Sequence, residues 1–242
     1  MRVLAITAYD GSRFFGSQIQ ENGTPTVMGR FEEALNSVGI FSMPTASGRT
    51  DSGVHALCQP IAFDIPHYWE NELAKLKAHL NAKLSPYIQI KRLFPVENDF
   101  HPRFDAKKRV YRYIVKIGEP TPFGSDFVTF VPSLDSFAVD KAISIFEGEH
   151  DFSLFKKTGS DEKSSVRRIY KTSFYEYRDL RIFKFEGNAF LRSQIRLMMG
   201  ALFDISDGKI TAEQLREQLA GEARHTVRIA APNGLYLSKV FY

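Results

Sequence analysis

The segment with the clearest chemical potential is residues 48–56, which read Gly-Arg-Thr-Asp-Ser-Gly-Val-His-Ala. Its two glycines permit backbone conformations that other residues avoid, so Arg49 and Asp51 are predicted to project from a tight loop between two strands. Asp and Gly are also the commonest turn residues, and an isolated pattern of this kind equally describes a turn in which Asp51 only caps backbone N–H groups. These nine residues taken alone therefore leave the function open.

Other residues that often carry chemistry form no recognisable set. The six histidines show no metal-ligand spacing, and the single Cys58 forms neither an internal disulfide nor a cysteine-based zinc site. The glycine-bounded stretch from Gly11 to Gly16 is followed by Ser-Gln, not by the Lys-Ser/Thr of a phosphate-binding loop. We therefore expect no dedicated metal site and no phosphate-binding loop, and cysteine usage of this kind is typical of the reducing cytoplasm.

Composition indicates an ordinary globular chain. Its 242 residues are 43% hydrophobic and 25% charged, which suits one large domain or two small ones. No apolar run approaches the roughly 18 residues that a membrane span needs. The apolar stretch at the N-terminus is interrupted by polar Thr7 and Asp10, which is too early for a signal peptide. We therefore expect the mature chain to begin at Met1 and not to bind membranes.

Basic residues concentrate in the second part of the chain. Residues 1–100 carry 9 Lys/Arg and 10 Asp/Glu, whereas residues 101–242 carry 23 and 18. One cluster, between residues 103 and 116, contains a single acidic residue, Asp105, and is interleaved with aromatic residues. Its basic members are Arg103, Lys107, Lys108, Arg109, Arg112 and Lys116. A second cluster comprises Lys163, Arg167, Arg168 and Lys171. Such runs also describe solvated strand edges, but the interleaved Phe104, Tyr111 and Tyr113 favour RNA binding.

Periodicity predicts two similar halves. The first half is predicted to contain strand 2–10, a helix that begins at Thr24-Pro25, strands 41–46 and 57–65, helix 69–80 and strand 87–94. The second is predicted to contain strand 109–117, helix 136–147, strands 166–175 and 181–186, helices 189–205 and 211–219, and strand 234–240. The fold class is therefore predicted to be α+β. We expect two ferredoxin-like (split βαβ, RNP-like) units, 1–100 and 101–242, with largely antiparallel sheets that flank a basic catalytic cleft.

Residues 48–56 resemble the signature loop of the TruA-type tRNA pseudouridine synthases, in which the aspartate is essential. The likeness continues in family order through residues 9–16, 99–104, 111–113, 148–152, 187–190 with Arg196 and Gly200, and 231–237. The resemblance implies an isomerase that detaches uracil from ribose at N1 and reattaches it through C5, at uridines 38, 39 and 40 of the tRNA anticodon arm. It also implies a cytoplasmic homodimer that needs no cofactor or metal.

The resemblance also implies roles for individual residues. Asp51 is the catalytic carboxylate, Arg196 keeps it ionised, and Tyr111 stacks on the flipped uracil, although Tyr113 has the same strand parity. Arg49 fills the space left by the base or holds a flanking phosphate. Five basic residues are expected to contact the tRNA backbone: Lys107, Lys108, Arg109, Arg167 and Arg168.

The chain departs from the family pattern at two places. Ser17 stands where many members have tryptophan, and residues 191–196 read Leu-Arg-Ser-Gln-Ile-Arg where His-Met-Val-Arg is common. Two other functions are weighed against the isomerase: an RNA-binding or RNA-chaperone module without catalysis, and a metal-dependent nuclease using Asp10, Asp51 and Asp64.

Overall fold

The computed structural model describes residues 1–21, 23–157, 159 and 164–242, and the chain divides into two compact units. The first unit comprises Met1–Lys107 with Tyr236–Tyr242, and the second comprises Lys108–Leu235. The strand expected at 234–240 thus lies mainly in the first unit, whereas a division at residue 100 assigns it to the second. Among the described residues, no helix is long and apolar enough to cross a membrane.

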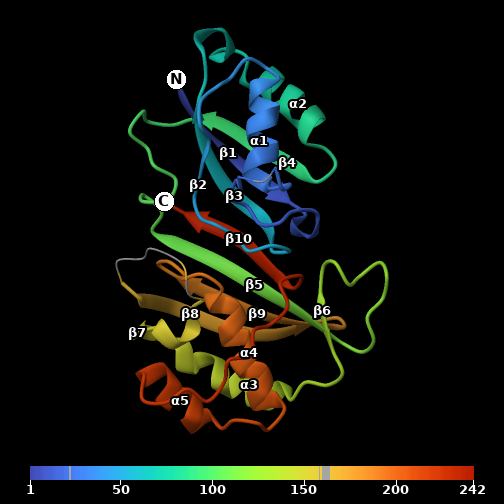
Figure 1. Ribbon diagram of the computed structural model, residues 1–242, viewed down its shortest axis with the longest axis vertical. Helices are drawn as coiled ribbons and strands as arrows, with labels where there is room; N and C mark the ends of the chain where they lie inside the picture. Colours follow the sequence, from blue (N-terminus) through green and yellow to red (C-terminus); the bar gives the residue numbers. More distant parts are fainter. Residues whose placement is uncertain (22, 158, 160–163) are drawn as a thin grey trace. The chain divides into compact units, whose positions relative to one another are not determined.

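The first unit is a sheet covered on one face by two helices (Figure 1). Its strands are β1 (Arg2–Tyr9), β2 (Thr45–Ala46), β3 (His55–Asp64), β4 (Ile88–Pro95) and β10 (Leu235–Phe241). β1 lies between β4 and β3 and is antiparallel to both. β2 pairs antiparallel with the C-terminal end of β3, and β10 pairs parallel with its N-terminal end. β3 is therefore the strand around which this unit is built.

Two α-helices, α1 (Val27–Asn36) and α2 (Leu73–Leu84), bury apolar residues against this sheet. The ring of Phe31 on α1 meets that of Phe63 on β3 edge-on, with 5.7 Å between centroids. The N-cap of α1 is Thr26, not the predicted Thr24, because its hydroxyl accepts the Gly29 N–H at 3.2 Å. The first unit therefore has the predicted element order, with shifted boundaries.

Two boundary predictions in the first unit were wrong for physical reasons. The strand expected at 41–46 is only two residues long, because Phe41 and Met43 are each 81% exposed and Pro44 has no N–H for a ladder. The helix expected from residue 69 begins at Leu73, after the 3-10 turn His67–Trp69. The Trp69 indole instead donates to the Val38 carbonyl at 3.1 Å and packs beyond the end of α1.

The second unit has the sheet order β5-β9-β8-β7, all antiparallel, with β6 parallel to β5. Its strands are β5 (Lys108–Ile117), β6 (Thr129–Val131), β7 (Gly148–Asp151), β8 (Val166–Tyr177) and β9 (Leu180–Gly187). The short strands β6 and β7 were not predicted. β6 reads Thr-Phe-Val and β7 reads Gly-Glu-His-Asp, so neither contains enough apolar residues for a recognisable alternation.

Helices α3 (Ser136–Ile143), α4 (Gln194–Ser206) and α5 (Ala212–Ala220) complete the second unit (Figure 1). The predicted helix 189–205 begins only at Gln194. Asn188 opens a loop there, since its side-chain oxygen accepts the Ala189 and Arg168 N–H groups, and Ser193 has a φ of 59°. Both units are mixed α+β with mostly antiparallel sheets, as predicted.

Candidate functional site

The loop before β3 presents Asp51 from a tight turn of the first unit. The Val54 N–H donates to the Asp51 carbonyl at 3.1 Å, and Gly53, the third residue of this turn, has a φ of 78°. A positive φ at that position is the reason a glycine is needed. Arg49 is exposed and Asp51 is half-buried, so the carboxylate belongs to a loop anchored in the protein.

The loop is fastened to the core on both sides of Arg49. The Gln59 side chain donates to the Gly48 carbonyl at 2.7 Å, and the Ser47 hydroxyl donates to the Gln59 side-chain oxygen at 2.7 Å. On the other side, the hydroxyls of Tyr9 and Thr50 lie 2.8 Å apart in a buried hydrogen bond. These contacts make the backbone that carries Arg49 and Asp51 rigid.

His55, at the first position of β3, supports the same loop. Its Nδ1 accepts the Gly11 N–H at 3.0 Å, and its ring stacks on Tyr236 with 4.7 Å between centroids. The pKa of the Tyr236 hydroxyl is raised by burial. An added Cβ on Gly11 would lie 2.0 Å from the Val54 carbonyl oxygen, so only glycine fits beside this loop. The histidine is 1% exposed, and these contacts give it a structural role.

The three carboxylates of the nuclease hypothesis do not form a cluster. Asp64 is the last residue of β3 and pairs with Arg2 at 3.0 Å, whereas Asp51 precedes the first residue of that ten-residue strand. A strand of this length separates its two ends by about 30 Å. Among the described residues, no three His, Cys, Asp or Glu side chains are grouped so that they hold a metal ion.

In the second unit, Tyr111 and Tyr113 lie on one face of β5 in different surroundings. Tyr113 is fully buried, and its hydroxyl donates to the Ala231 carbonyl at 2.8 Å and bonds with the Thr129 hydroxyl at 2.7 Å. Burial raises the pKa of the Tyr113 hydroxyl. Tyr111 is 8% exposed and meets Phe190 edge-on at 5.1 Å between centroids. These surroundings give Tyr113 a structural role and favour Tyr111 as the functional tyrosine.

Arg196 lies in the first turn of α4 and is half-buried. Its Nε donates to the Ala230 carbonyl at 2.8 Å, and the Ala230 N–H donates back to the Arg196 carbonyl at 2.9 Å. The side chain is therefore held by a defined partner and does not simply extend into water. Gly200, one turn later on α4, lets the chain segment that contains Ala230 approach closely, since an added Cβ would lie 1.9 Å from the Arg228 carbonyl oxygen.

The five basic residues predicted to contact RNA differ in exposure. Lys107 and Arg168 are exposed, whereas Arg109 is 9% exposed and donates to the Asn188 carbonyl at 2.7 Å. Lys108 pairs with Glu186 at 2.8 Å, and its hydrogen bond lowers the pKa of that carboxyl. Arg167 is half-buried and donates to the Ser164 carbonyl at 2.9 Å. Lys163, named with the second basic cluster, lies outside the described residues.

Asn188 was quoted in the sequence motif but not predicted as a site residue. Its carbonyl accepts a hydrogen bond from the Arg109 guanidinium, and its side-chain oxygen accepts one from the backbone N–H of Arg168 at 3.0 Å. Asn188 therefore contacts the side chain of Arg109 and the backbone of Arg168 at the start of the loop before α4. Ser17 and Tyr9 were missed in the same way, because their partners in residues 48–56 are distant in sequence.

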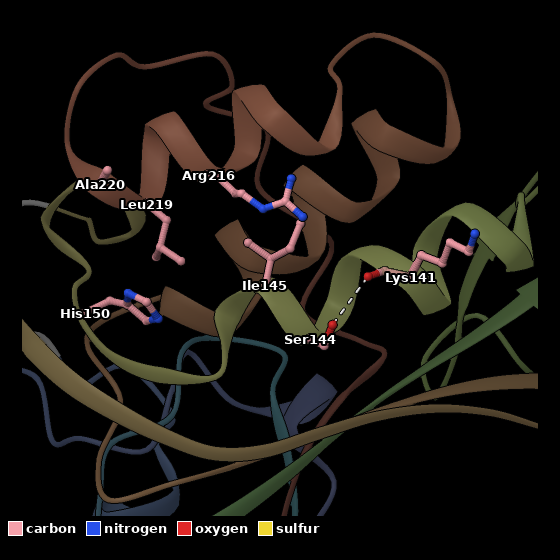
Figure 2. A pocket seen from close by; sticks show the side chains of 7 residues that line it. All are labelled: Lys141, Ser144, Ile145, His150, Arg216, Leu219 and Ala220. Atoms are coloured by element: carbon pink, nitrogen blue, oxygen red, sulfur yellow. Dashed lines mark hydrogen bonds between the residues drawn. The ribbon is translucent and has the colours of Figure 1, made fainter.

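A cavity of about 440 Å³ in the second unit contains none of the predicted site residues (Figure 2). It is lined by Lys141, Ser144, Ile145, His150, Arg216, Leu219 and Ala220. The Lys141 ammonium lies 4.1 Å from the centroid of the Phe137 ring, and Arg216 pairs with Glu213 at 2.9 Å. The cations beside this cavity thus have partners within the protein, and we assign it no role in the chemistry.

Comparisons with known proteins match this chain to one family. A family model described as tRNA pseudouridine synthase matches residues 5–105 and 142–242. A protein of Wolinella succinogenes described as tRNA pseudouridine synthase A is 43% identical over 240 residues, which cover 99% of this chain and 94% of the relative. Proteins of the same description from Helicobacter hepaticus and Helicobacter pylori are 39% and 40% identical, each alignment covering 98% of both chains. Asp51 and Arg196 lie within the ranges matched by the family model, whereas Tyr111 lies between them.

Proposed function

Because this chain belongs to the tRNA pseudouridine synthase family, we propose that it converts uridines 38, 39 and 40 of the tRNA anticodon arm to pseudouridine, with Asp51 as its essential carboxylate. It is an isomerase of the intramolecular transferase type. The observation that carries the role of Asp51 is its position, half-buried in a glycine turn that hydrogen bonds hold at Gly48 and Thr50 on one side and at His55 on the other. An aspartate that only capped a surface turn would need no such anchoring.

The reaction needs charge stabilisation and precise position. The N1–C1′ bond breaks, the uracil rotates, a C5–C1′ bond forms, and the proton lost from C5 is balanced by one gained at N1. Positive character develops on the ribose as the first bond breaks, and a carboxylate stabilises it, attacks C1′, or removes a proton from C2′. All three routes require Asp51 to be ionised. The atoms balance within one nucleotide, so the isomerisation consumes no co-substrate.

The remaining residues bind and orient the RNA in this proposal. Tyr111 stacks on the flipped uracil, and stacking offsets part of the few kcal/mol that unstacking a base costs. Arg196 favours the charged form of Asp51, and Arg49 holds the flanking phosphate or the space left by the base. Backbone phosphates are contacted by the basic residues Lys107, Lys108, Arg109, Arg167 and Arg168. The exposed side chains of Lys107 and Arg168 support this role most directly.

The ferredoxin-like architecture is supported best in the first unit. Its strand order β4-β1-β3-β2, with antiparallel neighbours and one helix in each of the two crossovers, is the order of a split βαβ fold. The second unit has the order β5-β9-β8-β7 with the additional β6. The basic catalytic cleft remains a prediction.

We also propose a cytoplasmic homodimer. Tyr175 and Tyr177 are two residues apart on β8, so their side chains lie on the same face of the strand, and they are 38% and 56% exposed. Aromatic side chains are enriched at protein interfaces, which supports this surface as part of a contact between two copies. The single Cys58 is free, which supports a reducing compartment.

Substitution of the catalytic carboxylate tests the function. We expect Asp51→Asn to abolish pseudouridine formation in an anticodon-arm transcript, because the amide carries no negative charge. The affinity for the transcript should be kept. Asp64→Asn, a change of the same type at an exposed aspartate, is the control and should keep the activity. Full product formation by Asp51→Asn would show that the assignment is wrong.

The competing functions give different results in the same assay. An RNA-binding module without catalysis would bind the transcript tightly, yet the unchanged protein would produce no pseudouridine. A metal-dependent nuclease would cleave the transcript and lose this activity in EDTA. Mapping of pseudouridine at positions 38, 39 and 40 in tRNA from cells with and without the protein tests the choice of uridines.

A further inference from the structure

Ser17 is buried beside the catalytic loop, with 2% of its surface exposed. Its hydroxyl accepts the Thr50 N–H at 2.8 Å, and its own N–H donates to the Thr50 carbonyl at 3.1 Å. Thr50 directly precedes Asp51 in the chain. We propose that Ser17 is a positioning residue that fixes the backbone leading into Asp51, an inference that rests on the proposed role of Asp51.

The hydroxyl of Ser17 completes the hydrogen bonding of Thr50. Thr50 is 9% exposed, and its backbone N–H and carbonyl both bond to Ser17, while its hydroxyl bonds to that of Tyr9 at 2.8 Å. A buried N–H without an acceptor is unfavourable, so the loop keeps the conformation in which Ser17 accepts this bond. A tryptophan indole is a donor only and does not accept an N–H. The contact is therefore specific to a small hydroxyl residue at this position.

Ser17 is itself held by the N-terminus of α1. The Met28 N–H donates to the Ser17 carbonyl at 2.9 Å, and the Val27 N–H donates to the Gly16 carbonyl at 3.3 Å. These are N–H groups of the first helical turn, which have no partner within the helix. Gly16 has a φ of 97°, and an added Cβ would lie 3.2 Å from the Thr50 carbonyl oxygen, so the approach requires glycine. The helix thus provides a rigid support for the two residues that contact Thr50.

The residue on the other side of Asp51 is held by the same segment. The Ser52 hydroxyl donates to the Phe14 carbonyl at 3.3 Å. Residues 14–17 therefore bond to both chain neighbours of Asp51. The expected consequence is catalytic: a loop that moves by about 1 Å misplaces a reacting group and slows the chemical step by roughly 100-fold. RNA affinity does not depend on this alignment.

The test compares Ser17→Ala with Thr172→Val under single-turnover conditions on an anticodon-arm transcript. Thr172 is a matched control, because its hydroxyl is buried and donates to the Glu147 carboxylate at 2.8 Å in the second unit. We expect Ser17→Ala to slow pseudouridine formation by about 10-fold to 100-fold with unchanged RNA affinity. Thr172→Val should lower the thermal midpoint and keep the rate. Ser17→Thr, which retains the acceptor oxygen, should recover most of the rate.

Two outcomes would overturn the role of Ser17. One is a folded Ser17→Ala protein with the rate of the unchanged enzyme. The other is rapid hydrogen exchange of the Thr50 amide in the unchanged protein, which needs no variant and would show that the bond is not maintained. If Asp51→Asn keeps full activity, the proposed function fails first. If Asp51→Asn is inactive and Ser17→Ala is fully active, only the positioning role fails.

Discussion

Two tyrosines on one face of β5 show how surroundings separate residues that a strand pattern treats alike. Tyr111 and Tyr113 are two residues apart on β5. The Tyr113 hydroxyl bonds to Ala231 and Thr129 in the core, whereas the Tyr111 ring lies edge-on to Phe190. The same distinction applies to His55 and Asp51, which lie four residues apart. His55 is buried, with its ring hydrogen-bonded to the Gly11 N–H and stacked on Tyr236, whereas Asp51 is only half-buried.

A structural role for Tyr113 predicts a loss of stability without a loss of activity. Tyr113→Phe removes the donor to the Ala231 carbonyl and should lower the free energy of unfolding by about 1–2 kcal/mol. Urea denaturation measures this change, and the rate of pseudouridine formation should stay that of the unchanged protein. A slow Tyr113→Phe enzyme of normal stability would instead give the catalytic role to Tyr113.

Helix α4 connects the packing of the second unit to Arg196. Its buried residues include Met198, Met199 and Phe203, and the ring of Phe203 meets that of Tyr113 at 6.1 Å between centroids. The helix lies against the segment from Arg228 to Ala230, with Gly200 at the closest approach and Arg196 bonded to Ala230. A change in this contact is therefore expected to move the arginine as well as to destabilise the helix.

Gly200→Ala tests this contact. The new Cβ would meet the Arg228 carbonyl oxygen at 1.9 Å, and we expect a loss of about 1–3 kcal/mol in unfolding free energy together with slower catalysis. Lys75→Ala, an exposed change on α2, is the control and should leave both the stability and the rate unchanged. An unchanged thermal midpoint for Gly200→Ala would contradict this packing.

For the molecule as a whole, charge and exposed aromatic surface lie mainly in the second half of the chain. Residues 101–242 carry the surplus of basic residues, and Tyr175 and Tyr177 are exposed on β8. Each unit supplies part of the proposed chemistry: Arg49 and Asp51 come from the first, Tyr111 and Arg196 from the second.

The proposed homodimer predicts a mass of twice the 27.6 kDa chain in light scattering at micromolar concentration. Replacing Tyr175 and Tyr177 by lysine should shift the mass toward that of one chain, because two buried charges oppose the contact. Lys75→Ala, an exposed change on α2, should have no effect. A mass of 27.6 kDa at all concentrations would refute the dimer.

Local patterns were sufficient to predict the α+β class, the order of the longer elements and the loop that carries Asp51. Helical spacing, alternation and paired glycines act over a few residues, so they can be recognised without knowledge of the fold. The two-residue β2, the start of α4 and the unit that contains β10 were not predicted. They depend on partners elsewhere, such as the pairing of Tyr236 with His55.

In the candidate site, too, some features could be predicted from the sequence and others only from the fold. The sequence identifies Asp51, Arg49 and the basic clusters by residue type and motif. The bond of Ser17 to Thr50 joins residues 33 positions apart, and that of Tyr113 to Ala231 joins residues 118 apart. Such contacts form only when the chain folds back on itself, because hydrogen bonds and burial depend on distance in space and not on separation along the chain. The folded protein therefore shows which side chains hydrogen-bond to the candidate loop and to the core, while the sequence indicates the chemistry proposed for the loop.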